Sequence, residues 1–304
     1  MDCKSNLHRV LSERKFAVTA EIGPPKGSDS SKIQSKSDIV KDYADAFNIT
    51  DNQTAVVRLS SFGGSCIILK KGLEPIMQIS CRDRNRIALQ SDVLGAASIG
   101  IKNILFITGD HQSFGNHPSA MGVFDIDSIQ LIKIVKDMRD KGIFQNGEEI
   151  RFGRPDIFIG AAANPFADPV DFRVDRLEKK ILAGADFIQT QSVYNLERFN
   201  IWMDEIRSRG LDNKVFVIAG ITPLKSLKMC ERMKFHVPGV DIPDNIYKRI
   251  KNSEDVKQEG FDISCELINE VKKIKGVHGI HITALFWEDI IPKLIEETGL
   301  FPRP

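Results

Sequence analysis

Short apolar runs alternate with amphipathic segments along most of the chain. The apolar runs are rich in β-branched residues and favour strands, whereas the segments between them carry apolar residues at helical spacing. Strands are predicted at residues 15–22, 46–50, 75–81, 103–108, 156–162, 186–191, 214–219 and 278–284. Several helical segments end on a glycine, the usual left-handed cap before the next strand. The pattern therefore consists of strand-then-helix units repeated along the chain.

Eight such units predict an α/β protein with a single (β/α)8 TIM barrel, because a doubly wound sheet usually has about five or six strands. The chain has 304 residues, and no linker or low-complexity tract divides it, so we expect one domain over residues 1–304. Residues 235–257 are predicted to form a turn and an extra helical insertion. Residues 110–125 form a long polar loop, and such loops are more often functional than idle.

Charge and composition narrow the possible partners and the compartment. The chain carries 42 Lys and Arg against 41 Asp and Glu, a balance that argues against nucleic acid. No apolar run approaches the ~18 residues that span a bilayer, and no secretory signal is evident, so we expect a cytoplasmic protein. The five cysteines and six histidines are scattered, which predicts reduced thiols and no protein-held metal.

The polar residues at the predicted strand ends are the candidates for chemistry, because active sites of such barrels lie there. Glu21 ends an otherwise apolar strand, where burial should raise its pKa and make it a candidate general acid; an ion pair at the barrel rim is the alternative. Asp110 follows Gly109, which permits close approach of a ligand; a capping or loop role is the alternative. Gln191 can offer a donor and an acceptor to a heterocycle edge.

Several common catalytic motifs are absent from the chain. It contains no GxGxxG after a strand, no GxxxxGKS and no GxSxG, which argues against a dinucleotide-binding sheet, a phosphate loop and an esterase elbow. No lysine lies within a predicted strand core, so a Schiff-base aldolase has no obvious nucleophile.

An ordered set of motifs resembles one enzyme family nearly from end to end. The motifs are TAEIGPPKG, NITDN, LFITGDH, LEKKILAGADFIQTQ, VIAGITPL and GIHITALFWEDIIPKLIEETGL, between about residues 14 and 302. Together they resemble the methylenetetrahydrofolate reductase family. The resemblance implies a flavoprotein barrel of one-carbon metabolism and methionine biosynthesis that reduces 5,10-methylenetetrahydrofolate to 5-methyltetrahydrofolate. FAD is the expected cofactor and FMN the alternative.

The resemblance also implies roles for individual residues. Glu21 would protonate the folate so that its five-membered ring opens to the 5-iminium cation, and Asp110 would stabilise that cation beside the flavin. Gln191, Asp110, Thr283 and Trp287 would contact the substrate. The expected flavin contacts, with Lys180 as the phosphate partner, are Thr50, Asp51, Gln78, Gly109, Asp110, Ala120, Asn164, Asp168 and Lys180.

Two positions depart from the pattern of the family's best-known bacterial members. Leu227 replaces a Phe against which the nicotinamide packs, and Trp287 replaces an Arg that helps hold folate, so NAD(P)H as direct electron donor stays open. The 110–125 loop and the carboxyl-terminal motif are similar to a divergent branch in anaerobes with the acetyl-CoA pathway. That branch implies an electron-transfer partner subunit and a homo- or hetero-oligomer.

Other functions remain open from the residues alone. One is a methylene-tetrahydropterin reductase that lacks flavin or depends on a partner subunit for electrons, and another is a non-catalytic subunit that binds a C1-pterin. A phosphate-binding lyase is disfavoured. Such an enzyme would have a glycine-rich phosphate site after strands seven and eight, whereas the segment AGITPL offers one glycine and a proline.

Overall fold

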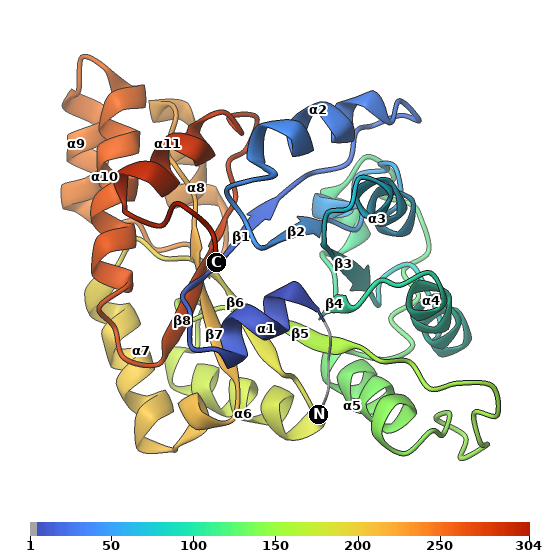
Figure 1. Ribbon diagram of the computed structural model, residues 1–304. Coiled ribbons are helices and arrows are strands. Elements are labelled where there is room, and N and C mark those ends of the chain that lie inside the picture. Colours follow the sequence, from blue (N-terminus) through green and yellow to red (C-terminus); the bar gives the residue numbers. More distant parts are fainter. Residues whose placement is uncertain (1–4) are drawn as a thin grey trace.

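The computed structural model describes residues 5–304, which form a closed barrel of parallel strands (Figure 1). The strands are β1 (Ala17–Glu21), β2 (Ala46–Ile49), β3 (Pro75–Ser80), β4 (Asn103–Ile107), β5 (Phe158–Ala163), β6 (Phe187–Ser192), β7 (Phe216–Ile221) and β8 (Val277–Ile282). Each strand pairs with its neighbours in sequence, and β8 closes the barrel against β1. The predicted (β/α)8 fold is confirmed, with every expected strand at its place.

Helices cover the outside of the barrel. They are α1 (Asn6–Ser12), α2 (Ser31–Val40), α3 (Ser61–Lys70), α4 (Arg86–Ser98), α5 (Ser128–Asp140), α6 (Arg173–Ala183), α7 (Leu196–Ser208), α8 (Leu227–His236), α9 (Asp244–Asn252), α10 (Val256–Val271) and α11 (Ile290–Glu297). Helix α9 falls within the 235–257 insertion. Short 3-10 turns are η1 (Gln53–Ala55), η2 (Gln112–Phe114), η3 (Val170–Phe172) and η4 (Leu211–Asn213). The extent of the domain, residues 1–304, stays a prediction.

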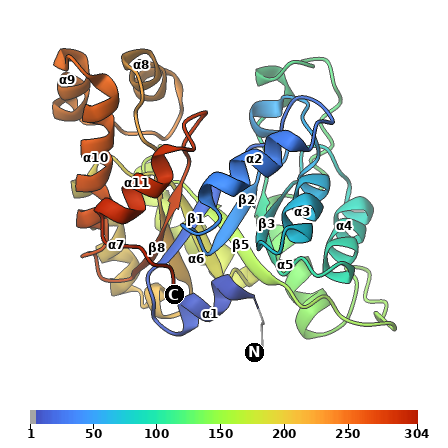
Figure 2. The same cartoon turned by 45° about the horizontal axis from the view of Figure 1, so that its top comes forward.

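The amino-terminal end of the barrel is filled with apolar side chains. Helix α1 lies across this end, away from α8 and α9 (Figure 2). Its side chains pack on inward-facing residues of the strands; this cluster is Leu7, Val10, Leu11, Ala17, Ala46, Ile76, Leu105, Phe158, Phe187 and Ile218. The rings of Phe158 and Phe187 stack at 5.0 Å, and a Cβ at Gly160 would lie 2.3 Å from the Phe187 ring. Among residues 5–304, the barrel interior is therefore closed at its amino-terminal end, and the carboxyl ends of the strands are the side open to ligands.

A half-buried carboxylate holds α1 to the barrel. Glu74, directly before β3, accepts hydrogen bonds from the backbone N–H groups of Asn6 at 2.5 Å and Leu7 at 2.9 Å. It also accepts one from the Asn103 amide at 2.8 Å. Burial raises the pKa of Glu74, opposed by these bonds. The first N–H groups of a helix have no partner within the helix, so Glu74 supplies the partner that α1 lacks.

The described residues contain no long apolar span and no obvious ligand set for a metal. Within residues 5–304, no helix is long and apolar enough to cross a membrane, and no group of His, Cys, Asp or Glu is arranged to hold a metal ion. Cys3 lies outside the described residues. The other cysteines, Cys66, Cys81, Cys230 and Cys265, are free thiols.

We predict that Glu74→Ala destabilises the protein by about 1–3 kcal/mol, because it leaves buried N–H groups without partners. Glu13→Ala is the matched control: Glu13 follows the same helix, but its bridge to Arg9 is exposed, and the unfolding free energy should hardly change. Urea unfolding of both variants measures the difference. Equal losses in the two variants would contradict the role assigned to Glu74.

Candidate active site at the carboxyl ends of the strands

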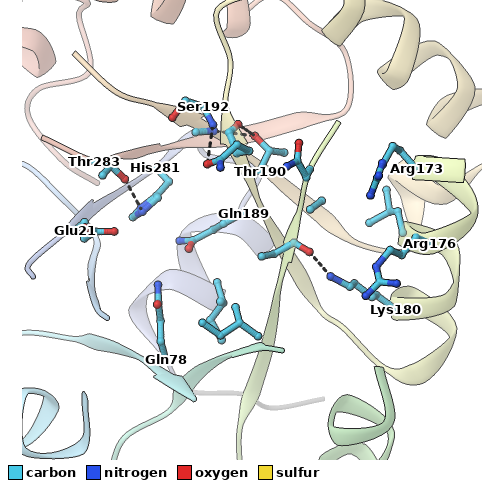
Figure 3. Close-up of a pocket in the computed structure, with 18 residues that line it drawn as sticks. Glu21, Gln78, Arg173, Arg176, Lys180, Gln189, Thr190, Ser192, His281 and Thr283 are labelled. Atoms are coloured by element: carbon cyan, nitrogen blue, oxygen red, sulfur yellow. Dashed lines mark hydrogen bonds between the residues drawn. The ribbon is translucent and has the colours of Figure 1, made fainter. Parts of the chain in front are cut away.

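A cavity of about 360 Å³ opens at the carboxyl ends of the strands, between the barrel and α6 (Figure 3). The sequence-predicted residues that line it are Glu21, Gln78, Asn164, Lys180, Gln191 and Thr283. The lining residues that the sequence did not single out include Arg173, Arg176, Gln189 and His281. The structure thus gathers an acid, several carboxamides and three cations around one space.

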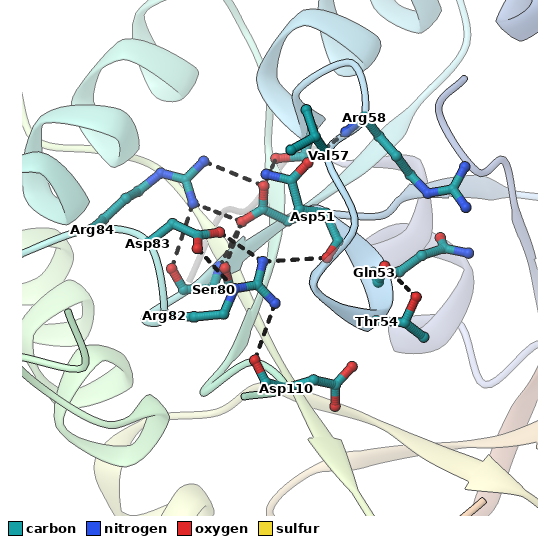
Figure 4. Close-up of polar contacts among 12 residues, drawn as sticks. Asp51, Gln53, Thr54, Val57, Arg58, Ser80, Arg82, Asp83, Arg84 and Asp110 are labelled. Carbon is teal, nitrogen blue, oxygen red and sulfur yellow. Dashed lines mark hydrogen bonds and ion pairs between the residues drawn. The ribbon is translucent and has the colours of Figure 1, made fainter. Parts of the chain in front are cut away.

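The remaining predicted site residues lie outside this lining. Asp51 is buried, and its carboxylate accepts hydrogen bonds from the backbone and hydroxyl of Ser80, both at 2.9 Å (Figure 4). Arg84 completes the contact at 2.7 Å. The Thr50 hydroxyl donates to the Gln53 side chain. The structure therefore places Asp51 in a contact that joins β2 and β3, not in the cavity wall.

Asp110 lies at the rim of the barrel mouth. Its backbone carbonyl accepts a hydrogen bond from Arg82 at 3.2 Å, while its side chain is directed away from that arginine (Figure 4). Gly109, just before it, has a φ of +94°, and a Cβ there would lie 3.0 Å from Arg82 Cβ. Glycine therefore shapes this turn, as its freedom at positive φ allows, and the Asp110 carboxylate stays exposed.

Three further predicted positions lie on loops. Ala120 and Asp168 are exposed, and Trp287 is half-buried against the hydrophobic core. The neighbouring Phe286 is 76% exposed, with the ammonium groups of Lys36 and Lys225 at 5.6 and 5.5 Å from its ring centroid. The aromatic ring offered to solvent by the loop after β8 is therefore Phe286 rather than Trp287.

Glu21 has the electrostatics of a proton donor. Burial raises the pKa of its carboxyl to about 7, although Lys36 and Arg58 oppose the shift. Lys36 itself pairs with Glu288, and Arg58 donates to the carbonyl of Pro24. Within residues 5–304 the Glu21 carboxyl has no ion pair or hydrogen bond of its own. It therefore lacks the rim ion pair that was the alternative to an acid role.

His281 lies inside the barrel next to Glu21 and has the opposite shift. Burial lowers the pKa of its imidazole to about 4, and Nδ1 lies 2.9 Å from the Thr19 hydroxyl. At neutral pH His281 is therefore uncharged, while Glu21 is near its titration midpoint. The pKa of the carboxyl therefore lies above that of the imidazole, the reverse of their usual order. Active sites often separate the pKa values of two neighbouring groups in this way, so that each can take a different role in proton transfer. Strand alternation could have found His281, because it shares the inward face with Thr283.

Helix α6 presents a cationic wall, Arg173, Arg176 and Lys180, to the cavity, across from Glu21 (Figure 3). Spacings of three and four residues place these side chains on one helix face. Burial, with Arg176 nearby, lowers the pKa of Lys180 to about 8. Lys180 donates to the Ala162 carbonyl and Arg173 to that of Ala167. None of the three pairs with a carboxylate of the described residues, so the wall suits an anionic ligand.

The fold is a (β/α)8 barrel whose candidate site is the cavity at the carboxyl ends of the strands. The family model described as methylenetetrahydrofolate reductase matches residues 6–299. The chain belongs to the methylenetetrahydrofolate reductase family.

Curated members of this family are about a quarter identical to this chain over the aligned residues. Methylenetetrahydrofolate reductase 1 of Schizosaccharomyces pombe is 24% identical over 241 residues, covering 75% of this chain and 36% of the relative. Methylenetetrahydrofolate reductase 2 of Saccharomyces cerevisiae is 26% identical, covering 76% and 37%. The Salmonella typhimurium enzyme is 24% identical, covering 77% and 73%. The chain thus matches little more than a third of the yeast proteins.

A solved structure has the same fold along the whole chain. It is an uncharacterized protein from Clostridium thermocellum that binds two copies of 5-methyl-5,6,7,8-tetrahydrofolic acid. The TM-score is 0.70 at 17% identity, and the match covers 98% of this chain and 100% of that one. At this identity the likeness establishes the barrel architecture.

The raised pKa of Glu21 predicts a pH-dependent stability difference between the wild type and Glu21→Gln. The folded carboxyl holds its proton up to about pH 7, whereas the ordinary pKa of a glutamate is 4.5, so the folded state loses stability as the pH rises between these values. Glu21→Gln lacks this loss and should exceed the wild type by about 1–3 kcal/mol above pH 7. The two should be equal near pH 4. Urea unfolding at each pH checks this, and a constant difference would show an ordinary pKa.

Proposed function

We propose that the protein is a flavin-dependent reductase that converts 5,10-methylenetetrahydrofolate to 5-methyltetrahydrofolate. The observation that carries the proposal is Glu21 in the mouth of the barrel, a half-buried carboxyl with a pKa of about 7 and no hydrogen-bond or ion-pair partner among the described residues. Family membership over residues 6–299 supports the substrate class.

The donor set of the cavity fits a flavin nucleotide. Arg176 and Lys180 have no carboxylate partner and would hold its phosphate, and a bound phosphate would offset the desolvation that lowers the Lys180 pKa. The carboxamides of Gln78 and Asn164 line the same cavity and can bind polar edges of the ring system or its ribityl chain. A reduced flavin held by these residues would supply hydride to the methylene carbon of the folate.

The chain's own residues would act on the folate. Glu21 gives its proton to the folate amine as the five-membered ring opens, which a pKa near neutrality favours. Gln191 can bind the pterin edge through both its amide and its carbonyl. Asp110 at the rim would place a negative charge near the resulting cation. Thr283 lines the cavity, and we propose that it contacts the substrate, with Trp287 supporting the loop after β8.

The electron donor is part of the same proposal. Leu227 begins α8 and packs partly against the hydrophobic core, so this position gives a nicotinamide ring no aromatic surface. We propose FAD as the flavin and a partner protein as its reductant, with NAD(P)H as the alternative donor.

A second candidate function is the binding of a reduced folate without its reduction. The likeness to a Clostridium thermocellum protein that binds two copies of 5-methyl-5,6,7,8-tetrahydrofolic acid favours it. The two candidate functions differ in whether the protein binds flavin. A purified protein that binds no flavin under any condition would favour the folate carrier.

We predict that Glu21→Gln lowers the turnover of methylenetetrahydrofolate by roughly 10²–10⁴-fold, because the ring opening loses its acid. Flavin affinity should stay unchanged, since the amide has the same shape. Glu288→Gln is the control: Glu288 lies near Glu21 but already pairs with Lys36, and most activity should survive. Steady-state formation of 5-methyltetrahydrofolate measures both, and normal turnover by Glu21→Gln would sink the mechanism.

We predict that Arg176→Met raises the dissociation constant of FAD by roughly 10-fold, because a charged hydrogen bond to phosphate is lost. Riboflavin, which has no phosphate, should bind equally to the variant and the wild type. Lys179→Met is the control, because Lys179 is exposed and lies over the Phe172 ring, 5.2 Å from its centroid. Fluorescence titration with both flavins measures the effect. If Arg176→Met lost as much affinity for riboflavin as for FAD, Arg176 would not be the residue that binds the phosphate.

A further inference from the structure

A polar layer fills the middle of the barrel, between the apolar end plugged by α1 and the open cavity. It consists of Thr19 on β1, Asn48 on β2, Gln189 on β6 and His281 on β8, and each side chain is at most 7% exposed. Buried polar groups are costly unless they are hydrogen-bonded, so the pattern of bonds in this layer is informative.

Asn48 and Gln189 form a reciprocal amide pair. The Asn48 amide donates to the Gln189 carbonyl at 2.5 Å, and the Gln189 amide donates to the Asn48 carbonyl at 3.0 Å. The same Gln189 Nε2 donates its second hydrogen to the Thr19 hydroxyl oxygen at 3.1 Å. Both amide hydrogens of Gln189 are therefore used, and Thr19 must accept one of them.

Thr19 has a single hydrogen left to donate. Its neighbours are His281 Nδ1 at 2.9 Å and the Ile280 carbonyl at 3.4 Å. The contact to Nδ1 is the shorter of the two, which favours a hydroxyl that donates to Nδ1 over one that donates to the Ile280 carbonyl and accepts from Nδ1–H. A neutral imidazole that accepts at Nδ1 carries its proton on Nε2.

We propose that Asn48 and Gln189 are positioning residues that hold His281 in its Nε2–H tautomer and so make it a fixed hydrogen-bond donor to the ligand. Nε2 lies 3.4 Å from the Thr283 hydroxyl at the cavity surface, a long contact that leaves the N–H available. The complementary ligand group is a carbonyl oxygen or an unprotonated ring nitrogen. The inference rests on the proposed function only in naming a pterin as that ligand.

The opposite arrangement has a different signature. If both amides were rotated by half a turn, the Gln189 oxygen would accept from Thr19, and Thr19 would have to accept from His281 Nδ1–H. The orientation of the amide pair and the tautomer of His281 therefore change together, and a measurement of the tautomer decides between the two arrangements. The lowered pKa of His281, about 4, means that the neutral ring is present throughout the neutral pH range.

The test is long-range proton–nitrogen NMR of the full chain labelled with nitrogen-15 in its histidines, with His281 assigned by the loss of its signals in His281→Gln. We expect a pyrrole-type Nε2 and a pyridine-type Nδ1, unchanged between about pH 5.5 and 8. A pyrrole-type Nδ1, or signals averaged between the two nitrogens, would overturn the inference. This measurement uses the ligand-free wild type and requires no activity.

A variant pair tests the role of the amides. Gln189→Met removes the donor to Thr19 and should abolish the preference for Nε2–H, whereas Gln78→Met, which alters another cavity carboxamide with no bond to Thr19, should keep it. An unchanged tautomer in folded Gln189→Met would overturn the positioning role. If methylenetetrahydrofolate is the substrate, kcat/KM should also fall roughly tenfold in Gln189→Met. A wild type with the expected tautomer but no reductase activity would refute the proposed function and leave the inference standing.

Discussion

The interior of a closed barrel must be filled by side chains, and this constraint determines the environment of the residues at its mouth. In the part of the chain that the structure describes, the amino-terminal half is packed with apolar side chains and closed by α1, so water reaches the interior from the carboxyl ends of the strands. Polar groups just above the plug are then desolvated on one side. The raised pKa of Glu21 and the lowered pKa values of His281 and Lys180 all have burial as their largest cause.

The cavity is electrostatically polarised across the barrel. Glu21 lies on one side, and the cationic wall of α6 lies on the other (Figure 3). A net charge of +1 for the whole chain conceals this separation. The arrangement suits two ligands bound side by side, one with a basic group near Glu21 and one with an anionic group near the cationic wall. A reduced folate and a flavin phosphate together have these properties. The polar layer beneath the cavity is uncharged at neutral pH, because burial lowers the pKa of His281 to about 4.

The sequence predicted the barrel well because each parallel strand is a short apolar run bounded by turns and followed by an amphipathic helix. It also located Glu21, Gln78 and Gln191, whose strand positions face the cavity. Asp51 also follows a strand end, but its carboxylate bonds to Ser80 outside the cavity lining, and its expected contact with a flavin stays a prediction.

The positions of further residues at the site depend on three-dimensional packing. Arg173 and Arg176 lie on a helix, and only the approach of α6 to the strand ends turns them towards the cavity. His281 and Gln189 are distant in sequence from Thr19, and their roles come from bonds across the barrel. The position of Trp287 depends on the loop after β8, where no periodic pattern indicates which aromatic ring is buried.

The most direct test of the account is a single turnover without air. The protein is loaded with FAD, reduced with a viologen and mixed with 5,10-methylenetetrahydrofolate, while the flavin absorbance and the folate products are followed. The account predicts that the flavin is reoxidised as one equivalent of 5-methyltetrahydrofolate forms. A flavin that binds and is reduced, yet stays reduced in the presence of the folate, would contradict it.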